Sequence, residues 1–452
     1  MRLRKTITTI VATAILLAGW QLFAVIANQP ELIPSLPRLV RTLCEWLVSG
    51  SFYQSVGATI LRGILGMSIS FVCAIGMAGL FARFEWVYEL FRPLLAIMRS
   101  IPVISFILLA LIFLNPESIP LMIAFLTMFP LLTENLTRGI LDLRPGLSIM
   151  ARQFHIKRSN VLFQIIYPQL KPFLYSGLAS AAGFGWRAII MGEVLSQCAF
   201  GIGSEMKRAQ NFIAVPELLA WTIVAVFISF FFDKGISKVA DITPKISFAN
   251  EHQTIPTPTL SVLDTKDISY QYGIQHFSHS FQKGIIYGIS APSGKGKTTL
   301  LNLIGDILLP TEGEIHPTRH FGIATIFQQP QLLPHLTAEE NIILPLSSFL
   351  TEEKARRIAQ KHLQEMEMEP FGNRYPKELS YGQQQRIAIA RALAYPSPLL
   401  LMDEPFKGLD EALSHRIIER IREMQMKEER IILFTSHNPD EIRLLADEVI
   451  YL

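Results

Sequence analysis

The first half of the chain is a succession of apolar runs that lack charged residues. The first extends from Thr6 to Pro30, 25 positions without a charge, which is long enough for a helix to cross a hydrocarbon layer about 30 Å thick. Five more runs follow, at Gly63–Phe81, Ser100–Pro116, Ser118–Thr133, Pro172–Trp186 and Leu218–Phe232. Helices buried in a soluble protein would carry polar faces, and these runs largely do not. With modest extensions, the pattern predicts about six transmembrane helices.

Lysine and arginine are distributed unevenly between the connections of these helices. If the N-terminus is cytoplasmic, the cytoplasmic segments contain Arg2, Arg4, Lys5, Arg83, Arg92, Arg138, Arg144, Arg152, Lys157, Arg158, Lys171, Lys234 and Lys238. The outer segments then contain only Arg38, Arg41, Lys207 and Arg208. By the positive-inside rule, this asymmetry predicts a multi-pass protein of the cytoplasmic membrane with both ends in the cytoplasm.

The apolar pattern ends near residue 240, where the charge balance changes sign. Residues 1–240 carry 20 lysines and arginines against 11 acidic residues, and the remainder carries 21 against 27. Half of all residues are hydrophobic and 17% are charged, which excludes a disordered chain or a coiled coil. Neither half is basic enough to predict a nucleic-acid partner. We therefore expect a membrane domain at residues 1–240, a linker at 241–260 and a soluble domain at 261–452.

The strongest motif of the second half is APSGKGKTT, from Ala291 to Thr299. A strand-like run precedes it and a helix-like run follows, which is the context of a phosphate-binding P-loop. Backbone N–H groups and the start of the helix would surround the phosphates. The residues expected at ATP are Ser293, Gly294, Gly296, Lys297, Thr298 and Thr299. Lys297 would reach the β- and γ-phosphates and Thr298 would ligate Mg²⁺. Ala291 stands where glycine is usual, so we expect a strained turn and weakened binding.

Further motifs follow in a fixed order. LSYGQQQR at residues 379–386 is similar to the Leu-Ser-Gly-Gly-Gln signature, and LLLMDEP at 399–405 matches a buried strand that ends in two carboxylates. Asp403 would hold Mg²⁺, and Glu404 would polarise the attacking water as general base. Single-residue matches occur at Tyr272, Gln328 and His437. Together with the P-loop, these motifs resemble the ABC ATPases over nearly all of residues 260–452.

This resemblance implies roles for the remaining motif residues. Tyr272 would stack on adenine, Gln328 would sense Mg²⁺ as a metal-site residue, and His437 would contact the γ-phosphate. The signature residues would cap ATP bound to a second copy of the chain, so that two chains enclose two ATP molecules; these residues are Ser380, Gly382 and Gln383. Tyr381 replaces a signature glycine, so its ring must point away from the phosphates or slow hydrolysis.

Residues 137–171 form the longest predicted cytoplasmic connection. They resemble the coupling loop of binding-protein-dependent ABC importers, with matches at Ala151, Arg152, Phe163, Ile166, Pro168, Pro172, Gly177 and Leu178. The resemblance implies a short helix that docks on the ATPase through Met150, Ala151, Arg152 and His155. His155 stands where the family usually has glycine, and the usual glutamate is missing. Up to about residue 235 the chain most resembles permeases for sulfonates, taurine, nitrate and thiamine-precursor pyrimidines.

Two ionisable residues, Arg187 and Glu193, lie in the fifth predicted span. Charges at membrane depth are costly, so each is expected to face the bundle interior or a wet path. The two residues are six positions apart and therefore lie on different faces of a helix, so we do not expect them to neutralise each other. Arg187 could meet an anionic substrate or a structural partner. Arg62 and Arg99 lie nearer span ends, where snorkelling accounts for them.

These observations predict a polytopic helical membrane domain followed by an α/β P-loop ABC ATPase. The implied protein is a homodimeric importer of a small solute, embedded in membrane lipid, that uses ATP and Mg²⁺ and receives its substrate from a separate extracytoplasmic binding protein. The resemblance suggests a small anion such as a sulfonate, taurine or nitrate, or a thiamine-precursor pyrimidine. Two alternatives remain: half of an ABC exporter, and a membrane-anchored ATP switch that transports nothing.

Overall fold

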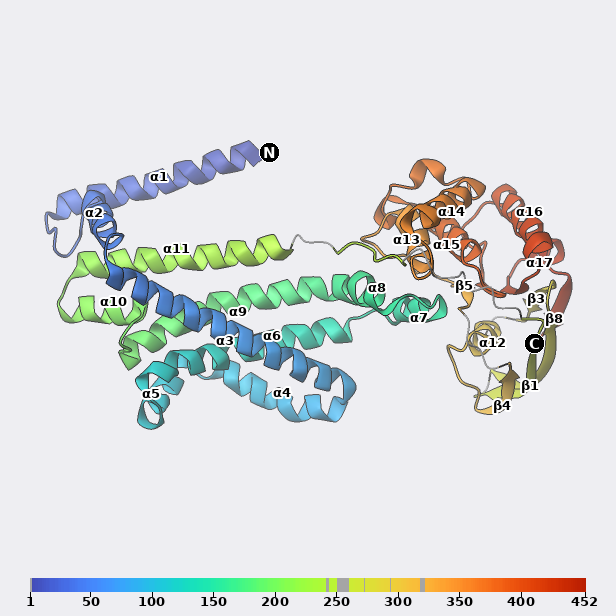
Figure 1. The fold of residues 1–452 in the computed structure, drawn as a ribbon, viewed down its shortest axis with the longest axis horizontal. Coiled ribbons are helices and arrows are strands. Elements are labelled where there is room, and N and C mark those ends of the chain that lie inside the picture. Colours follow the sequence, from blue (N-terminus) through green and yellow to red (C-terminus); the bar gives the residue numbers. More distant parts are fainter. Residues whose placement is uncertain (1, 241–243, 250–259, 272, 293, 318–321) are drawn as a thin grey trace. The chain divides into compact units, whose positions relative to one another are not determined.

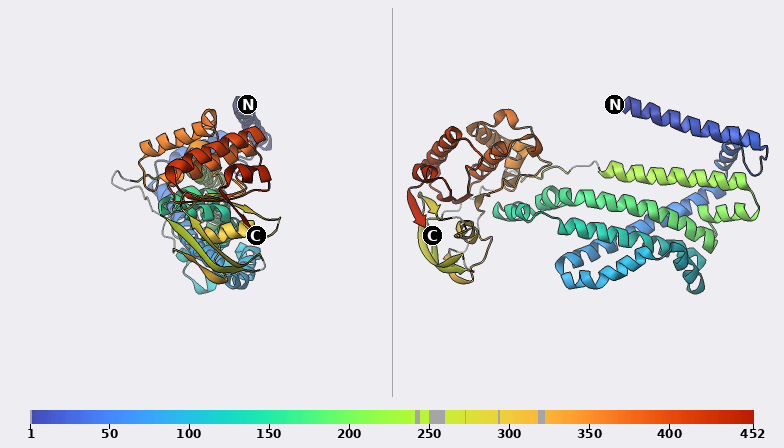
Figure 2. Two further views of the ribbon diagram at one scale, coloured as in Figure 1. Left: turned by 90° about the vertical axis from the view of Figure 1, so that its right-hand side faces the viewer. Right: turned by 180° about the vertical axis from the view of Figure 1, so that it is seen from behind.

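A computed structural model describes residues 2–240, 244–249, 260–271, 273–292, 294–317 and 322–452 (Figures 1 and 2). The chain divides into two compact units. The first unit contains residues 1–143 and 169–243, and the second contains residues 144–168 together with 244–452. The division therefore does not follow one cut in the sequence, because a short segment from within the apolar half packs with the C-terminal half.

The first unit is entirely helical in the part that the structure describes. Its elements are α1 (Arg2–Ala27), α2 (Leu36–Trp46), α3 (Gly50–Arg83), α4 (Glu85–Ser100), α5 (Val103–Phe113), η1 (Pro116–Ser118), α6 (Ile119–Leu141), α9 (Tyr167–Ser196, which starts in the second unit), α10 (Ile202–Asn211) and α11 (Val215–Ala240). Helices α3 and α6 cross closely: a Cβ atom on Gly66 would lie 2.6 Å from Cβ of Ala124. Small residues such as Ala74, Ala78 and Ala181 continue this core, as is usual where apolar helices pack tightly.

Among the described residues, four stretches are long and apolar enough to cross a membrane: Gly50–Arg83, Pro116–Leu141, Arg158–Ser196 and Val215–Lys238. A fifth is possible if α4 and α5, which meet at 94°, count as one broken span. The described apolar part of α1, Val11–Ala27, is shorter. Among the described residues the count is therefore four or five, against the predicted number of about six.

The third predicted span is broken between α4 and α5, and the break has a local cause. Pro102 cannot donate a backbone hydrogen bond and disfavours a helical conformation at Ile101, whose ψ is 130°. Helix α5 consequently restarts at Val103 in a new direction and is only 11 residues long. The uninterrupted apolar run from Ser100 to Pro116 concealed this break.

The second unit is an α/β structure with two sheets. An antiparallel sheet has the order β2-β1-β4, and a parallel sheet has the order β5-β6-β7-β3-β8. The strands are β1 (Val262–Tyr270), β2 (Ile274–Gln282), β3 (Ile286–Ser290), β4 (Glu312–His316), β5 (Ala324–Ile326), β6 (Leu399–Asp403), β7 (Ile431–Thr435) and β8 (Glu448–Tyr451). Every residue of β6 and β7 is buried, which explains their continuous apolar sequences, because helices cover both faces of a parallel sheet.

The helices of this unit are α7 (Pro145–Gln153), α8 (Arg158–Asn160), η2 (Val161–Ile166), α12 (Lys297–Ile304), α13 (Ala338–Leu346), α14 (Glu352–Glu365), η3 (Glu369–Phe371), η4 (Pro376–Glu378), α15 (Tyr381–Ala394), α16 (Glu411–Glu428) and α17 (Pro439–Leu445). The predicted architecture, an apolar helical domain followed by an α/β ATPase-type domain, is confirmed. Of the predicted linker, only residues 244–249 and 260 are described.

Candidate functional site

The P-loop connects β3 to α12, as its sequence predicts. Gly294 and Gly296 have φ values of +80° and +89°, a region that favours glycine, and a Cβ on Gly296 would lie 2.7 Å from the carbonyl oxygen of Gly273. Ala291 is not among the described residues with a positive φ, so its methyl group causes no left-handed backbone strain. Weakened nucleotide binding through the Ala291 methyl group stays a prediction.

Lys297 is the first residue of α12 and is buried. Its Nζ donates a hydrogen bond to the carbonyl oxygen of Ala291 at 2.7 Å and lies 3.4 Å from Nδ1 of His437. Helix α12 also points its N-terminus into this loop, which adds a positive dipole end. The arrangement can hold the phosphates of a nucleotide. Tyr272 and Ser293, also predicted at ATP, lie outside the described residues.

The two oxygen ligands predicted for a metal ion meet at the end of β6. Thr298 Oγ1 donates to Asp403 Oδ2 at 2.9 Å, and Thr435 Oγ1 donates to Asp403 Oδ1 at 2.8 Å. Burial raises the pKa of Asp403, although the two threonine hydrogen bonds oppose the shift. A hydroxyl beside a carboxylate is a donor set that suits Mg²⁺. No group of three or more His, Cys, Asp or Glu in the described part of the chain could hold a metal alone, so such an ion would also need phosphate oxygens.

Glu404, the predicted general base, follows β6 directly with a left-handed backbone (φ +48°). Its Oε1 lies 3.0 Å from Nε2 of His437, and its Oε2 lies 3.2 Å from Nζ of Lys407. Burial raises its pKa, but hydrogen bonds from Lys407 and Gln328 outweigh this and leave the pKa below its ordinary value. Glu404 is therefore an anion at neutral pH, as a base that activates water requires.

The three predicted catalytic residues Glu404, His437 and Gln328 thus lie together. They line a cavity of about 470 Å³ with Lys407, Ser436, Asn438 and Glu441. Sequence reasoning missed Lys407, although its position three residues after Glu404 in a tight turn was a usable signal. Gln328, predicted as a metal-site residue, here hydrogen-bonds the catalytic carboxylate instead.

The signature residues form the N-terminus of α15. Ser380 is the N-cap: its hydroxyl accepts a hydrogen bond from the backbone N–H of Gln383, and the Gln383 side chain accepts one from the Ser380 N–H. A Cβ on Gly382 would lie 2.7 Å from the carbonyl oxygen of Gly408. The motif therefore presents an ordered helix start, a site that favours an anion.

Residues 144–168, called the coupling segment from here on, pack inside the second unit. The carbonyl oxygen of Gln153 accepts a hydrogen bond from Ile323 N at 2.7 Å, immediately before β5. The Gln153 side chain accepts a hydrogen bond from Thr325 and donates one to the carbonyl oxygen of Gly305 at the end of α12. The segment therefore contacts both the helix that follows the P-loop and the strand that leads to Gln328.

Phe154 fixes the segment against α15. Its ring is fully buried, packs edge-on to Tyr395 and lies 5.5 Å from the guanidinium of Arg391. Arg391 also donates hydrogen bonds to the carbonyl oxygens of Gln331 and Pro330, just beyond Gln328. Burial lowers the pKa of Arg391 to about 9, so it remains a cation at neutral pH. The coupling segment, the stretch after Gln328 and the signature helix thus share one buried side chain.

The residues predicted to dock the coupling segment on the ATPase domain lie in the second unit. Met150 and Ala151 are buried, and Arg152 donates to the carbonyl oxygen of Asp306 at 3.2 Å. His155 has φ +45°, a conformation that favours glycine, which accounts for the usual residue at this position. Burial lowers the pKa of His155, so the ring is neutral. Sequence reasoning missed Gln153 and Phe154, whose roles depend on tertiary contacts.

Asn160 joins the coupling segment to the linker. Its Nδ2 donates to the carbonyl oxygen of Ser247 at 2.8 Å and to Ser347 Oγ, also at 2.8 Å, and its Oδ1 accepts from the Ser247 N–H at 2.8 Å. Gln164 adds a hydrogen bond to the carbonyl oxygen of Pro244. Asn160 is 1% exposed; its bond to Ser347 is buried, and the bonds to Ser247 and Pro244 are partly buried.

Replacing Asn160 with alanine should therefore lower the free energy of unfolding of the second unit by about 1–3 kcal/mol, because it removes the hydrogen bonds to Ser347 Oγ and to the backbone N–H and carbonyl of Ser247. Differential scanning calorimetry of the purified chain would measure the loss, and trypsin should cleave at Lys245 faster. The exposed Asn373→Ala is the matched control. Equal stability of the two variants would contradict this role.

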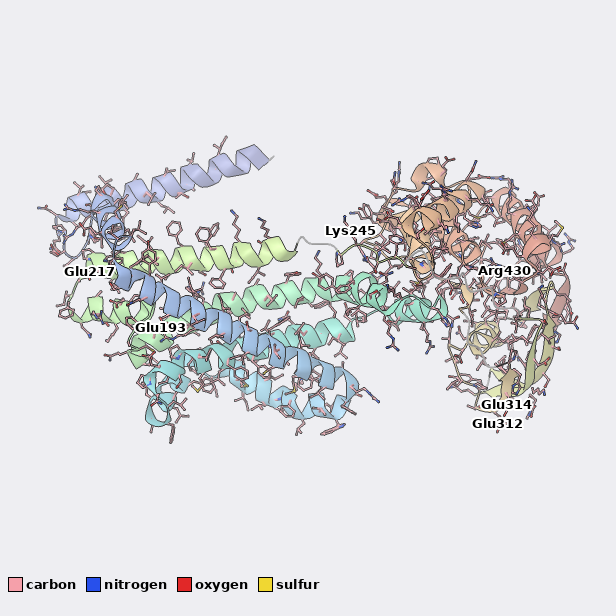
Figure 3. All side chains as sticks on the ribbon, viewed as in Figure 1. Glu193, Glu217, Lys245, Glu312, Glu314 and Arg430 are labelled. Carbon is pink, nitrogen blue, oxygen red and sulfur yellow. The ribbon has the colours of Figure 1, made fainter. Side chains whose placement is uncertain are left out.

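In the first unit, Glu193 and Arg187 differ in burial. Arg187 is exposed on α9, whereas Glu193 is fully buried and accepts hydrogen bonds from Thr59 Oγ1 (2.9 Å), Arg62 Nη1 (2.7 Å) and Gly203 N (2.9 Å) (Figure 3). Arg62 is only 13% exposed and also pairs with Glu117 at 2.6 Å. The snorkelling interpretation of Arg62 is wrong, since it is the internal partner of Glu193. A substrate path along either residue stays a prediction.

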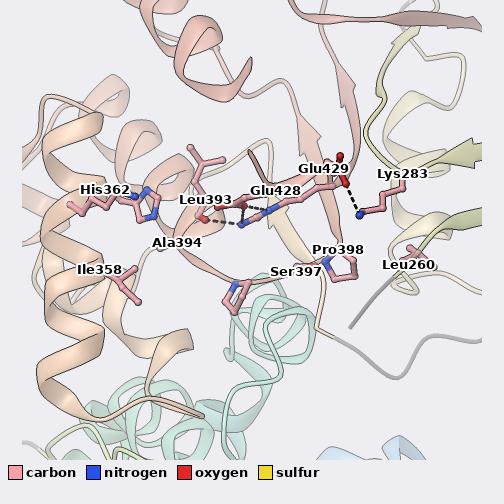
Figure 4. A pocket seen from close by; sticks show the side chains of 13 residues that line it. Leu260, Lys283, Ile358, His362, Leu393, Ala394, Ser397, Pro398, Glu428 and Glu429 are labelled. Atoms are coloured by element: carbon pink, nitrogen blue, oxygen red, sulfur yellow. Dashed lines mark hydrogen bonds and ion pairs between the residues drawn. The ribbon is translucent and has the colours of Figure 1, made fainter. Parts of the chain in front are cut away.

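A different hollow, of about 460 Å³, lies beside Pro398 and Arg430, which precede β6 and β7 (Figure 4). These are the amino ends of the strands, whereas the P-loop and Glu404 follow carboxyl ends. Arg430 pairs there with Glu428, and Lys283 pairs with Glu429 at 2.7 Å. This hollow is therefore separate from the phosphate-binding site.

Comparison with known proteins agrees with this geometry. The family model described as "ABC transporter" matches residues 274–407, and the model described as "Binding-protein-dependent transport system inner membrane component" matches residues 56–233. An uncharacterised ABC transporter ATP-binding protein of Methanocaldococcus jannaschii is 34% identical over 201 residues, which are 40% of this chain and 85% of that protein. The chain belongs to the ABC transporter family, and its second unit is an ABC ATPase domain.

Other relatives match the same region. The "Fe(3+) ions import ATP-binding protein" of Rhizobium etli is 35% identical over 189 residues (40% of this chain), and the "Glucose import ATP-binding protein" of Saccharolobus solfataricus is 35% identical over 185 residues (38% of this chain). The chain spans about half the length of these two proteins, 54% and 52%. A solved dimeric ATP-binding cassette bound to ADP and Pi is 32% identical over 42% of this chain and 94% of that chain, with a TM-score of 0.40.

Proposed function

We propose that the chain is a fused subunit of an ABC importer, in which a permease region and its ATPase are covalently joined. The observation that carries the proposal is the coupling segment: it lies between apolar stretches of the permease-type region, yet it packs around Gln153 and Phe154 within the ATPase unit. The match of residues 56–233 to an inner membrane component of binding-protein-dependent systems supports import as the direction.

Two copies of the chain assemble and enclose two ATP molecules. In each copy Lys297 binds the phosphates, Thr298 and Asp403 hold Mg²⁺, and Glu404 draws a proton from the attacking water. The helix start at Ser380, Gly382 and Gln383 caps the ATP of the partner subunit. Mg²⁺ held by Thr298 and Asp403 would supply positive charge at the phosphates. His437, 3.0 Å from Glu404, orients that carboxylate.

The chain lies in the cytoplasmic membrane with its ATPase unit in the cytoplasm, and an extracytoplasmic protein delivers the solute. The named relatives are ATP-binding proteins for import of Fe³⁺ ions and of glucose, and their similarity covers about 40% of this chain. For the solute we propose a small anion such as a sulfonate, taurine or nitrate, because Arg187 offers an exposed cation within a predicted span. A thiamine-precursor pyrimidine is the alternative.

The direct test is ATPase activity of the purified chain in proteoliposomes, with fractionated extracytoplasmic proteins from the source cells added. An importer predicts that one fraction stimulates hydrolysis, and native mass spectrometry of that fraction then identifies its bound solute. Uptake of radiolabelled taurine in the presence of that protein would confirm the direction. Stimulation by hydrophobic compounds without any protein would favour an exporter, and no stimulation would favour a switch.

The pKa shifts predict a Mg²⁺-dependent acid limb. Burial raises the pKa of Asp403 above its ordinary value, so this carboxylate takes up a proton at a higher pH than an ordinary aspartate as the pH falls. Activity is therefore full above the pKa of Asp403 and lost below it, and Mg²⁺ competes with that proton. We expect the acid limb of the ATPase profile to move to lower pH when Mg²⁺ is raised tenfold. An unmoved limb would contradict the role of Asp403.

A further inference from the structure

Tyr381, which replaces a signature glycine, makes two contacts within its own chain. Its hydroxyl donates a hydrogen bond to the carbonyl oxygen of Gln328 at 2.8 Å. Its ring packs on Gly408: a Cβ there would lie 2.8 Å from Cδ1 of the ring. Gly408 has φ +80°, a conformation that favours glycine, and its lack of a side chain leaves room for the ring. The ring thus lies against the turn after β6.

Gln328, which accepts the hydrogen bond from Tyr381, also contacts the catalytic carboxylate of Glu404. The side chain of Gln328 hydrogen-bonds Glu404, which also contacts Lys407 and His437. Two consecutive hydrogen bonds therefore run from the first residue of α15 to the general base of the same chain. They keep Glu404 engaged with protein groups, whereas catalysis requires the carboxylate to engage water.

The N-cap of α15 is adjacent to this link. Ser380 and Gln383 cap the helix reciprocally, and the 14-residue helix directs its positive end toward any anion there. If the proposed dimer is correct, that anion is the γ-phosphate of ATP held by the partner subunit. Tyr381 then stands between the nucleotide of one chain and the general base of the other.

We propose that Tyr381 is a positioning residue that couples the two ATP sites: ATP bound by the partner subunit draws the start of α15 toward its phosphate, and Tyr381 thereby releases Gln328 from Glu404. The inference rests on the proposed function, because it requires the dimer. It makes hydrolysis at each site depend on occupation of the other. It also gives a use to the tyrosine at a position where glycine would make neither contact.

The test uses the full chain in lipid nanodiscs and the variant Tyr381→Phe, which keeps the ring on Gly408 and removes only the hydroxyl. Loss of one neutral hydrogen bond should raise ATP turnover at low ATP about 2- to 10-fold. The Hill coefficient should fall toward one from a wild-type value that two sites limit to about two. Tyr451→Phe, an exposed tyrosine on β8, is the matched control. Unchanged turnover and Hill coefficient, or slower turnover with the wild-type Hill coefficient, would overturn the inference.

Mixed dimers make the test specific to one chain. One chain carries Glu404→Gln, so that only the other chain hydrolyses ATP, and Tyr381→Phe is placed in either chain in turn. The inference requires the larger effect when Tyr381→Phe lies in the hydrolysing chain, and equal effects would refute it. Failure of the chains to dimerise with ATP, measured by light scattering, would instead refute the proposed dimer, so the two failures are distinguishable.

Discussion

Glu404→Gln should reduce ATP turnover by about 10²- to 10⁴-fold, the usual contribution of a general base, while ATP binding is retained. The substitution keeps the size of the side chain, whose carboxylate oxygens lie 3.2 Å from Lys407 and 3.0 Å from His437 in the native chain. The two distances are to different oxygens, so the amide keeps an oxygen at one of them and places an NH2 group at the other, and it removes the negative charge that attracts the proton of water. Nucleotide contacts through Lys297 and Thr298 remain, so the variant should accumulate as an ATP-bound dimer.

Phosphate release and binding of a fluorescent ATP analogue would measure the two effects separately. Glu423→Gln is the matched control, since Glu423 lies exposed on α16 and pairs only with Arg420 among the described residues. A variant that hydrolyses ATP at the native rate would remove Glu404 from the mechanism. A variant that loses both hydrolysis and binding would place its role in the nucleotide site instead.

Lys297→Ala should abolish function at an earlier step, by weakening ATP binding itself. Hydrogen bonds to charged groups contribute about 1.5–3 kcal/mol, which corresponds to a loss of affinity of about 10- to 100-fold. Lys297 is 7% exposed and held by the carbonyl oxygen of Ala291, so it is already positioned in the loop. Turnover at saturating ATP should also fall, because the lysine neutralises charge that develops on the phosphates.

Lys295→Ala in the same loop is the control, because that side chain is exposed. Equilibrium binding of the ATP analogue and hydrolysis should both remain near native values in this variant. If Lys297→Ala and Lys295→Ala bind equally well, the phosphate-binding role of Lys297 is wrong.

The parts of the site that could be predicted from sequence are those in which local sequence determines local geometry. The P-loop between its strand and its helix and the buried strand that ends at Asp403 are each set by consecutive residues of the chain. Their secondary-structure context could be read from a few consecutive residues, and the structure has it as expected.

What could not be predicted depends on contacts between distant residues. Arg62 meets Glu193 across 131 positions, and Asn160 meets Ser247 across 87. Tyr381 and Gln328 are 53 positions apart, so the direction of the tyrosine ring had no local signal. The bend between α4 and α5 was missed for another reason: hydropathy averages over a window, whereas the bend at Pro102 is the property of one residue.

The place of the coupling segment has a consequence for how this chain can be taken apart. Met150, Phe154 and Ile165 belong to the same hydrophobic core as Ile326, Ile387 and Phe434 of the ATPase unit. A protease or a gene break at the linker would therefore yield a C-terminal fragment that has lost six buried apolar side chains of its own core, Met150, Phe154 and Ile165 among them. Such a fragment would expose their binding surface to water and tend to aggregate. The two halves follow one another in the sequence, but residues 144–168 of the first half pack in the core of the second unit. A separated C-terminal half would therefore require a partner that covers the surface left by residues 144–168.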